Sequence, residues 1–257
     1  MDPVYQVLLL EMSYITGGNN FLELMNINSV RLCYLIQQGG YDLSQIDEPQ
    51  QIQWLSELPA KKQSSIQRLV QYSDRITSIL ATRLLIRCAQ NEGIDAFRLR
   101  DVQYPDQGKP CWQGKAGDLF DFNISHSGKL IIVAASKTMK VGVDAEKIKA
   151  LKNLNFKMVM SVDELMQIQQ TPDLFFELWS QKEAVVKAAN TSGLGRMRDV
   201  QLKQDYAMLD DMKWYLTNIK LNESLTDQYA IHLATSRPVD EVITNQIILS
   251  DLIQHII

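Results

Sequence analysis

Paired cysteines are missing from this 257-residue sequence. It holds three cysteines, Cys33, Cys88 and Cys111, which are odd in number and scattered. A disulfide framework or a zinc site needs cysteines, or cysteines and histidines, at short repeated spacings, so the sequence favours neither. The pattern is typical of a reducing compartment, and the cytoplasm is the expected location.

Long apolar runs and an excess of basic residues are also lacking. No hydrophobic stretch reaches the length of a membrane span. The first residues, MDPVYQVLLLEMSY, carry no basic segment before their short apolar run, so no secretory signal is expected. The net charge of -4 gives no general field for nucleic acid. We therefore expect neither a membrane nor a nucleic acid as partner, and any phosphate must be bound locally.

Two common catalytic loops are absent as well. There is no glycine-rich loop of the Walker type, which weighs against a nucleoside triphosphate kinase. There is no Gly-x-Ser-x-Gly elbow, which weighs against a serine hydrolase. What remains is an ordinary globular composition, with 46% hydrophobic residues, in a chain long enough to bury a sizeable core.

Hydrophobic periodicity predicts a mixture of helices and strands. Apolar residues spaced three and four apart predict a helix over 61–88, and Thr171-Pro172 predicts the start of another that runs to about residue 190. The segment 120–136 ends as a strand, and we expect the turn 137–140 to join it to 141–143 as a hairpin. The other expectations are a strand at 4–14, a polar surface insert at about 17–50 with a short helix over 22–35 as an alternative, and alternating strands in the last sixty-odd residues.

The run VGVDAEKI, residues 141–148, holds the first candidate site. On a strand, residues two apart point the same way, so Asp144 and Glu146 project from one face. Two neighbouring carboxylates repel each other unless a positive charge separates them. Oxygen ligands suit a hard cation such as Mg2+. A solvated strand end is the alternative interpretation of this pair taken alone.

A second group lies on the predicted helix ELWSQKEAVVK, residues 177–187. Glu183 and Lys187 stand one turn apart at the border of its apolar stripe. They could supply one more metal ligand and one phosphate contact. A solvated ion pair on the helix surface, which contributes little stability, is the alternative.

Donors for phosphate occur in two further places. In FNISHSG, residues 122–128, Ser125 and His126 supply a hydroxyl and an imidazole in a loop that suits a phosphate oxygen. A capped turn with a structural histidine is the alternative. Lys109 lies in GKPCW, and the predicted first helices carry basic residues of which a subset could converge on an anion: Lys61, Lys62, Arg68, Arg75, Arg83 and Arg87.

The order and spacing of these motifs resemble a known family. The series GKP, NISHSG, GVDAE and WSQKEAVVK with a following GLG is similar to the larger, monomeric class of 4′-phosphopantetheinyl transferases, which activates peptide and polyketide synthases. The pair G-[IV]-D-x-E and W-[ST]-x-K-E-[AS]-x-x-K is the signature of that family. The resemblance covers residues 61–195, and the polar stretch at 17–50 departs from the family's compact start.

The resemblance implies an α+β fold with two similar αβ halves, related by pseudo-twofold symmetry, in mostly antiparallel sheets with packed helices. Residues 1–138 would form the N-terminal half, with the insert at 17–50, and residues 139–257 the C-terminal half with the metal-site motifs. The active site would lie at their interface. The implied activity transfers 4′-phosphopantetheine from coenzyme A to a serine of an apo acyl or peptidyl carrier protein, in peptide, polyketide or fatty acid synthesis. The implied enzyme is a cytoplasmic monomer that releases adenosine 3′,5′-bisphosphate.

The resemblance also assigns the catalytic centre. Asp144, Glu146 and Glu183 match the acidic ligands of Mg2+, with Mn2+ as an alternative metal. Lys187 matches the lysine that contacts the pyrophosphate of coenzyme A. Glu183, directly or through a metal-bound water, would accept the proton of the carrier serine, so Glu183, Lys187 and Asp144 are the expected catalytic residues.

Further residues match contacts to coenzyme A. Ser125 and His126 match the loop that holds the 3′-phosphate end, and Lys109 matches a lysine near the nucleotide. Arg75 and Ser78 fall where the family places early helix contacts to phosphate. The main rival is a non-catalytic module that binds coenzyme A or a carrier protein on the same fold. The three acidic residues argue against it, because binding alone does not need all of them.

Overall fold

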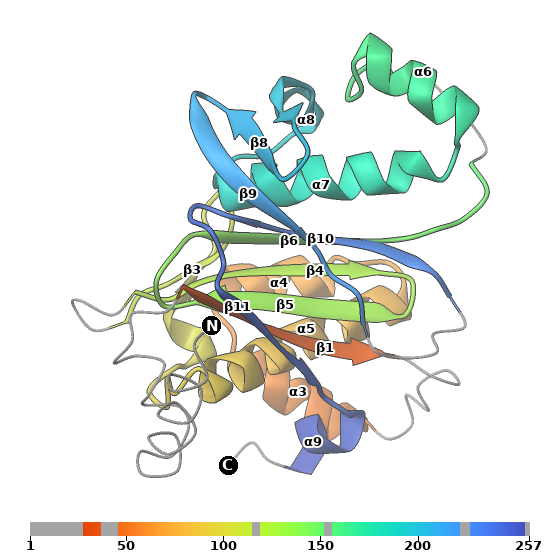
Figure 1. Ribbon diagram of the computed structural model, residues 1–257. Helices are drawn as coiled ribbons and strands as arrows, with labels where there is room; N and C mark the ends of the chain where they lie inside the picture. The colour runs from red at the N-terminus through yellow and green to blue at the C-terminus, as the bar shows by residue number, and fades with distance from the viewer. Residues whose placement is uncertain (1–27, 37–45, 115–118, 152–155, 222–226, 255–257) are drawn as a thin grey trace.

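The structure is a computed structural model that describes residues 28–36, 46–114, 119–151, 156–221 and 227–254. Two β-sheets lie one above the other, and helices cover the outer side of each sheet (Figure 1). Apolar side chains of both sheets fill the space between them, among them Leu32 and Ile132 from the first sheet and Val143 and Leu233 from the second. The expected α+β architecture is confirmed.

The first sheet has the strand order β11-β1-β5-β4. Strand β1 pairs in parallel with β11 and antiparallel with β5, and β4 forms a hairpin with β5. These strands are β1 (Ser29–Ile36), β4 (Asp121–Ser127), β5 (Leu130–Ser136) and β11 (Glu241–Gln246). The apolar residues of helix α5 (Tyr72–Asn91) pack against the outer face of this sheet. Three shorter helices lie beside α5: α3 (Glu48–Ser56), α4 (Ala60–Gln67) and α9 (Leu249–Gln254).

The second sheet has the strand order β6-β10-β9-β8-β7 and is antiparallel throughout. Its strands are β6 (Val141–Lys147), β7 (Gln201–Leu202), β8 (Tyr206–Leu209), β9 (Met212–Asn218) and β10 (Tyr229–Thr235). Helix α7 (Leu174–Ala188) crosses β6 and β10, and α8 (Leu194–Asp199) lies beside it. A small ribbon, η2 (Leu99–Asp101), β2 (Val102–Gln103) and β3 (Cys111–Trp112), precedes β4.

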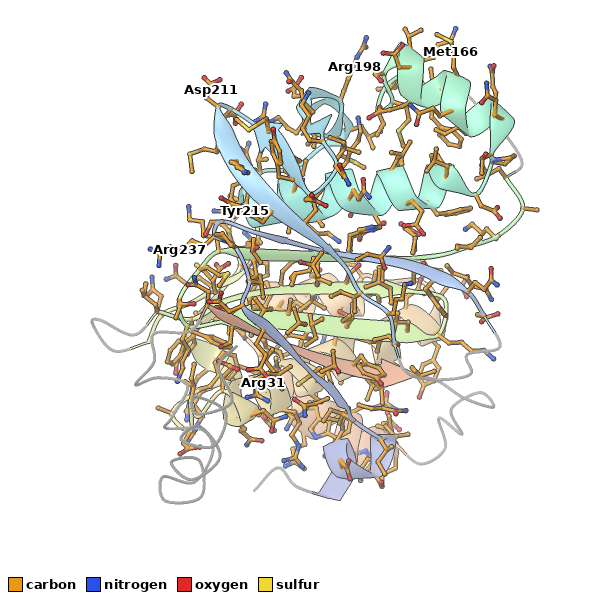
Figure 2. The ribbon with its side chains drawn as sticks, viewed as in Figure 1. Arg31, Met166, Arg198, Asp211, Tyr215 and Arg237 are labelled. Atoms are coloured by element: carbon orange, nitrogen blue, oxygen red, sulfur yellow. The ribbon has the colours of Figure 1, made fainter. Side chains whose placement is uncertain are left out.

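Helix α6 (Val162–Gln170) lies outside α7, farthest from the sheets (Figure 2). Its start is fixed by a capping box, in which Ser161 accepts from the Glu164 backbone and Glu164 accepts from the Ser161 backbone. Met166 on this helix projects outward and is 51% exposed. Among the described helices, none combines the length and apolar character needed to cross a membrane.

The expected hairpin between 120–136 and 141–143 is wrong. Strand β5 already pairs with β4 on one side and with β1 on the other, so it has no free edge to offer β6. The chain instead crosses at residues 137–140 to the second sheet, where β6 pairs with β10. The two strands that carry the candidate motifs, β4 and β6, therefore end as neighbouring edges of different sheets.

The polar surface insert at 17–50 is also wrong for residues 29–36, and the alternative helix over 22–35 is wrong for residues 29–35, the part of it that lies in this strand. The segment SVRLCYLI is strand β1, paired on both sides and buried along nearly its whole length. A strand flanked on both edges and covered on both faces is apolar without alternation, which hides its period. The expected strand at 4–14 lies outside the described residues.

Two further expectations change in detail. The helix predicted over 61–88 is two helices, α4 and α5, with a break at 68–71. The division of the chain at residue 138 stays a prediction, but the last strand, β11, belongs to the sheet of the first half. Helix α9 follows it there, with Leu252 fully buried beside α5.

Candidate active site

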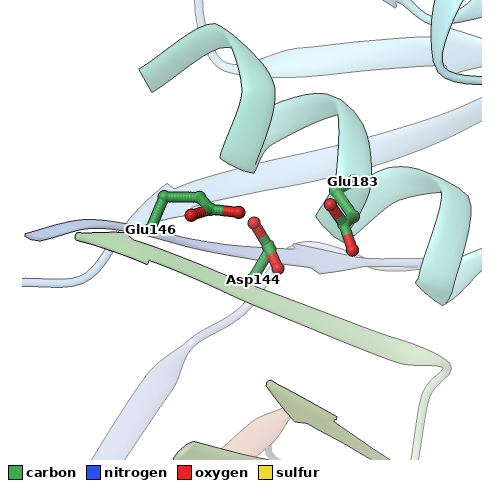
Figure 3. A group of neighbouring side chains, drawn as sticks. All are labelled: Asp144, Glu146 and Glu183. Carbon is green, nitrogen blue, oxygen red and sulfur yellow. The ribbon is translucent and has the colours of Figure 1, made fainter. Parts of the chain in front are cut away.

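Three carboxylates from two elements converge between strand β6 and helix α7 (Figure 3). Asp144 and Glu146 project from β6 toward α7, and Glu183 projects back from α7. Each offers a ligand oxygen, and these oxygens lie within 4.8 Å of one another. The side-chain alternation predicted from the sequence therefore places Asp144 and Glu146 as expected, and the packing of α7 supplies the third member.

Gly142 explains why α7 can approach β6 so closely. A Cβ atom at this position would lie 2.1 Å from the backbone oxygen of Ala184 and 2.4 Å from the backbone nitrogen of Ala188. Any side chain would push the helix backbone away from the strand. Because Gly142 precedes Asp144 by two residues on the same face, the helix that it admits carries Glu183 to the carboxylates.

Lys187 supplies positive charge within the cluster. Its Nζ lies 2.7 Å from Asp144 Oδ1 and 3.2 Å from Glu183 Oε1, and it also donates to Ser125 Oγ at 3.3 Å. Burial acts to lower the pKa of Lys187, but the carboxylates of Asp144 and Glu183 outweigh it, so the pKa is raised. The ammonium therefore stays charged, and the alternative of a plain surface ion pair between Glu183 and Lys187 is wrong.

Asp144 is the most enclosed of the three acids, at 2% exposure, which contradicts the alternative of a solvated strand end. Its Oδ1 accepts from Ser125 and from Lys187. Its Oδ2 is buried and has no hydrogen-bond partner in the described part of the chain. Burial raises the pKa of this carboxyl, and the nearby Glu183 adds to the rise against the opposing effect of Lys187. A buried carboxylate oxygen without a hydrogen-bond partner calls for an explanation, and a bound cation would provide one.

Glu146 and Glu183 are held by further donors. Burial, and then the charge of Asp144, raise the pKa of Glu146 to about 7, although Ser127 donates to its Oε2 at 3.2 Å. Glu183 Oε2 accepts from the Trp179 indole Nε1 at 2.8 Å. Both glutamates are partly exposed, so the cluster opens to solvent on their side while Asp144 closes it from below.

Ser125 and His126 lie on strand β4, so the expected loop is wrong, and alternation turns them to opposite faces. Ser125 faces the carboxylates, where Ala145 N and Lys187 Nζ donate to its hydroxyl and the hydroxyl donates to Asp144. His126 faces the helices of the first half. Partial burial, and then Lys187, lower the pKa of its imidazole, and the neighbouring charges of Asp74 and Lys62 also act on it.

The remaining expected contacts to coenzyme A are not gathered at the cluster. Lys109 forms a close ion pair with Asp121 at the other end of β4 and donates to Val141 O at 2.7 Å. Burial lowers the pKa of Lys109 despite that partner. Arg75, on the first turn of α5, donates to the backbone oxygen of Val70 at 3.4 Å. Ser78, one turn later, accepts from Lys62 Nζ at 3.1 Å.

Sequence reasoning missed several residues that shape the site. Trp179 stands one turn before Glu183, so its spacing could have revealed it. Lys62 was one of six basic residues expected to include contacts to an anion, and nothing in the sequence distinguished it from the others. His232 lies across from Asp144 in register, and burial lowers its pKa to about 4, so it is neutral and does not compensate the carboxylates. Its imidazole Nδ1 lies 2.6 Å from Ser180 Oγ, which only the fold reveals.

These features define a class. Three clustered carboxylates with one ammonium leave an excess of negative charge in a largely enclosed place, and each of the three offers oxygen to a cation. The residues fit a hard divalent ion better than a soft metal, because all three candidate ligands are carboxylates. The protein is an α+β protein with a candidate divalent-metal site at the junction of two sheet-and-helix halves.

Comparison with known proteins identifies the family. A family model described as 4′-phosphopantetheinyl transferase, N-terminal, matches residues 47–138, and one described as 4′-phosphopantetheinyl transferase superfamily matches residues 140–235. The chain belongs to the 4′-phosphopantetheinyl transferase superfamily. The second match contains β6 and α7, and with them the complete acidic cluster.

Individual relatives carry the same description. The chain is 33% identical over 120 residues to the 4′-phosphopantetheinyl transferase AcpT of Salmonella typhi, and the aligned region covers 44% of this chain and 58% of that protein. It is 35% identical over 117 residues to the 4′-phosphopantetheinyl transferase Sfp of Bacillus subtilis, covering 41% of this chain and 50% of that protein. The similarity to HetI of a Nostoc species is 29% over 111 residues, covering 38% and 45%. The chain therefore spans about half the length of the curated relatives that it matches.

Proposed function

We propose that this protein transfers the 4′-phosphopantetheine group of coenzyme A to a serine of an apo acyl or peptidyl carrier protein. The observation that carries the proposal is the cluster of Asp144, Glu146, Glu183 and Lys187, in a chain that belongs to this superfamily. The cluster combines a place for a divalent cation with a fixed ammonium, which is what a pyrophosphate needs. The sequence expectation of a cytoplasmic monomer belongs to the same proposal.

Mg2+, or Mn2+ in its place, would be held by Asp144, Glu146 and Glu183. When bound, the ion supplies neutralisation and alignment of the pyrophosphate of coenzyme A. The buried Asp144 Oδ2, which has no partner in the described part of the chain, supports the assignment. The raised pKa of Glu146 supports it as well, because such carboxylates are crowded without a cation.

Lys187 is placed to contact the same pyrophosphate. Its raised pKa keeps the ammonium protonated, so it serves as a fixed positive charge and not as a base. Asp144 and Glu183 hold it from two sides, which restricts a flexible side chain to one position. It would stabilise the charge that develops on the phosphate oxygens as the bond to the leaving group breaks.

Glu183 is the proposed proton acceptor. The carrier serine Oγ forms a bond to the β-phosphorus of coenzyme A, the pyrophosphate linkage breaks, and adenosine 3′,5′-bisphosphate leaves with the electron pair. The serine proton passes to the Glu183 carboxylate or to solvent that it orients. The Trp179 indole fixes one oxygen of Glu183, so the carboxylate is oriented before the substrates arrive.

Nucleotide contacts complete the proposal. His126 and Lys62, which lie near each other on the helix side of β4, would receive the 3′-phosphate. Ser78 contacts Lys62, and Arg75 precedes Ser78 by one turn of α5. Lys109 would approach the nucleotide from the opposite end of β4. Ser125 has its hydroxyl fully used inside the protein, so its proposed part in holding coenzyme A is indirect.

The proposal is tested by incubating the protein with coenzyme A, Mg2+ and an apo carrier protein, followed by intact-mass analysis of the carrier. We expect the carrier to gain the mass of the phosphopantetheine arm, and a carrier whose acceptor serine is replaced by alanine to gain nothing. Coenzyme A binding without any mass gain, over a panel of fatty-acid, peptide-synthase and polyketide-synthase carriers, would instead identify a non-catalytic binding module.

A further inference from the structure

The backbone N–H groups along the outer edge of β6 bond to side chains of β4 and not to the backbone of another strand. Strand β6 is the last strand of the second sheet, and β4 is the last strand of the first. The two strands lie against each other, but no backbone pairing between them occurs in the described residues. An edge strand exposes every second backbone N–H, and buried N–H groups need acceptors.

Side chains of β4 supply those acceptors in strict alternation. Val141 N donates to Asp121 Oδ2 at 2.7 Å, and Val143 N donates to Asn123 Oδ1 at 2.9 Å. The series continues two residues at a time through the hydroxyls of two serines, with distances of 3.3 and 3.0 Å: Ala145 N to Ser125 and Lys147 N to Ser127. We call these four links the side-chain ladder. It holds β6, which carries two of the carboxylates, against the first half of the molecule.

The two serine steps of the ladder do more than accept. Ser125 Oγ lies 2.9 Å from Asp144 Oδ1, and Ser127 Oγ lies 3.2 Å from Glu146 Oε2. The backbone N–H of the ladder occupies a lone pair of each hydroxyl, and a carboxylate in the ionised form that binds a cation has no proton to give. Each hydroxyl must therefore direct its single proton to the carboxylate beside it. The ladder thus fixes which oxygen of each carboxylate is engaged by the protein.

Engaging one oxygen leaves the other for a ligand. In Asp144 the serine and Lys187 occupy Oδ1, while Oδ2 is the buried atom without a partner among the described residues. Asn123 and Asp121, the first two ladder steps, have the same backbone role, but their acceptor oxygens bond β6 nitrogens and no carboxylate of the cluster. The contact between ladder and carboxylate is thus confined to the two serines.

We propose that Ser127 is a positioning residue for the metal site, whose hydroxyl orients the Glu146 carboxylate toward the cation, as Ser125 does for Asp144. The inference rests on the proposed function, because it concerns the same metal. Ser127 is the better position to test, because Ser125 also contacts Lys187 and a change there would disturb two groups at once. Residues that orient metal ligands in this way affect metal affinity without touching the ion.

The test measures Mn2+ binding by calorimetry and by electron paramagnetic resonance, with the full-length protein and without coenzyme A or carrier. We expect Ser127→Ala to weaken Mn2+ binding by about 10-fold or more, which is the usual effect of removing such a partner. Ser127→Thr keeps the hydroxyl and should restore most of the affinity. Asn123→Ala is the matched control, because it removes a ladder bond beside β6 but no contact to the cluster. It should lower the unfolding temperature and leave Mn2+ affinity unchanged.

Two results would overturn the inference alone: wild-type affinity in Ser127→Ala, or equal losses of affinity in Ser127→Ala and Asn123→Ala. The first would make the hydroxyl a backbone link only, and the second would make the effect one of strand position. Failure of the wild-type protein to bind Mn2+ would overturn the inference together with the metal site. Normal metal binding without transfer to any carrier would overturn the proposed function and leave the positioning role of Ser127 standing.

Discussion

Replacing Asp144 by asparagine removes one negative charge from the cluster and changes almost nothing in shape. The asparagine amide would still offer an oxygen to Ser125, but it would give a cation a neutral ligand in place of a buried carboxylate. Lys187 now pairs with two carboxylates, those of Asp144 and Glu183, and in the variant it would keep only Glu183 of these two. The substitution therefore separates the charge of Asp144 from its place in the packing.

The effect on folding should be small, because opposing interactions nearly cancel. At the 4.8 Å limit of the cluster, and with an effective dielectric constant of about 20, each repulsion of Asp144 by another ionised carboxylate is worth about 3.5 kcal/mol. The attraction to Lys187 at 2.7 Å is worth about 6 kcal/mol on the same scale. Glu183 repels Asp144 fully and Glu146, whose pKa is about 7, repels it in part, and the burial of the Asp144 charge adds to this cost. These unfavourable contributions oppose an attraction of similar size, so we expect the unfolding temperature of the metal-free protein to move only slightly.

The effect on turnover should be large. Loss of one preorganised electrostatic group in an enclosed site costs about 2.7–4 kcal/mol of transition-state stabilisation, or roughly 100- to 1,000-fold in rate. The assay measures the turnover number for apo carrier over a titration of Mg2+, beside the unfolding temperature. Asp106→Asn is the control, because this aspartate also pairs with a lysine, Lys61, but its side chain is 94% exposed and contacts no residue of the cluster in that pair. The control substitution should leave turnover unchanged. Turnover of Asp144→Asn close to wild type at saturating Mg2+ would refute the reasoning.

The other predictions concern Glu183, Glu146 and His126. Glu183→Gln keeps a similar shape but cannot accept the serine proton, so it should lower turnover far more than coenzyme A affinity; equal losses would make Glu183 a binding residue. The pKa of Glu146 is raised to about 7, so the metal-free fold favours its protonated form, and the unfolding temperature should fall as pH rises from about 4.5 to about 7. Mg2+ or Glu146→Gln should flatten that profile, and an unchanged slope in the variant would assign it to other groups. His126→Ala should weaken coenzyme A by about 1.5–3 kcal/mol and 3′-dephospho-coenzyme A much less; equal losses in calorimetry would make His126 structural.

The site was more predictable from the sequence than the sheets around it. Asp144 and Glu146 follow from the two-residue period of a strand, and the one-turn spacing of Glu183 and Lys187 follows from a helix. What no period shows is that Gly142 lets α7 approach β6, which brings the two pairs together. The resemblance to a known family supplied that step, and the geometry now gives its physical reason.

Strand partners were the main failure, because pairing depends on which edges are free. The expected hairpin of β5 with β6 was reasonable from a short turn between apolar runs, but β1 already occupies that edge of β5. Strand β1 itself was hidden, since its apolar residues do not alternate and its neighbours in sequence are polar. Its other partner, β11, lies more than two hundred residues away, as the pairing of Ser29 with Glu241 shows. Local patterns carry no information about such contacts.

The placement of Ser125 shows a subtler limit. Its residue type predicted a phosphate donor in a loop, and the structure puts it in a strand, between a backbone nitrogen, Lys187 and Asp144. A serine hydroxyl serves a ligand or a neighbouring side chain equally well, and only the surrounding partners decide which. The sequence therefore identified a motif that lies beside the carboxylates and left its chemistry open.

The central claim is that this cluster moves the phosphopantetheine arm from coenzyme A to a carrier serine. Its most direct test follows both products of one reaction, the modified carrier by intact mass and adenosine 3′,5′-bisphosphate by chromatography, with Mg2+ and limiting coenzyme A. The account predicts that wild-type protein forms the two products in equal amounts, and that Asp144→Asn or removal of Mg2+ by a chelator suppresses both together. A carrier that stays unmodified while the wild-type protein binds coenzyme A and Mg2+, or equal yields from wild type and Asp144→Asn, would contradict it.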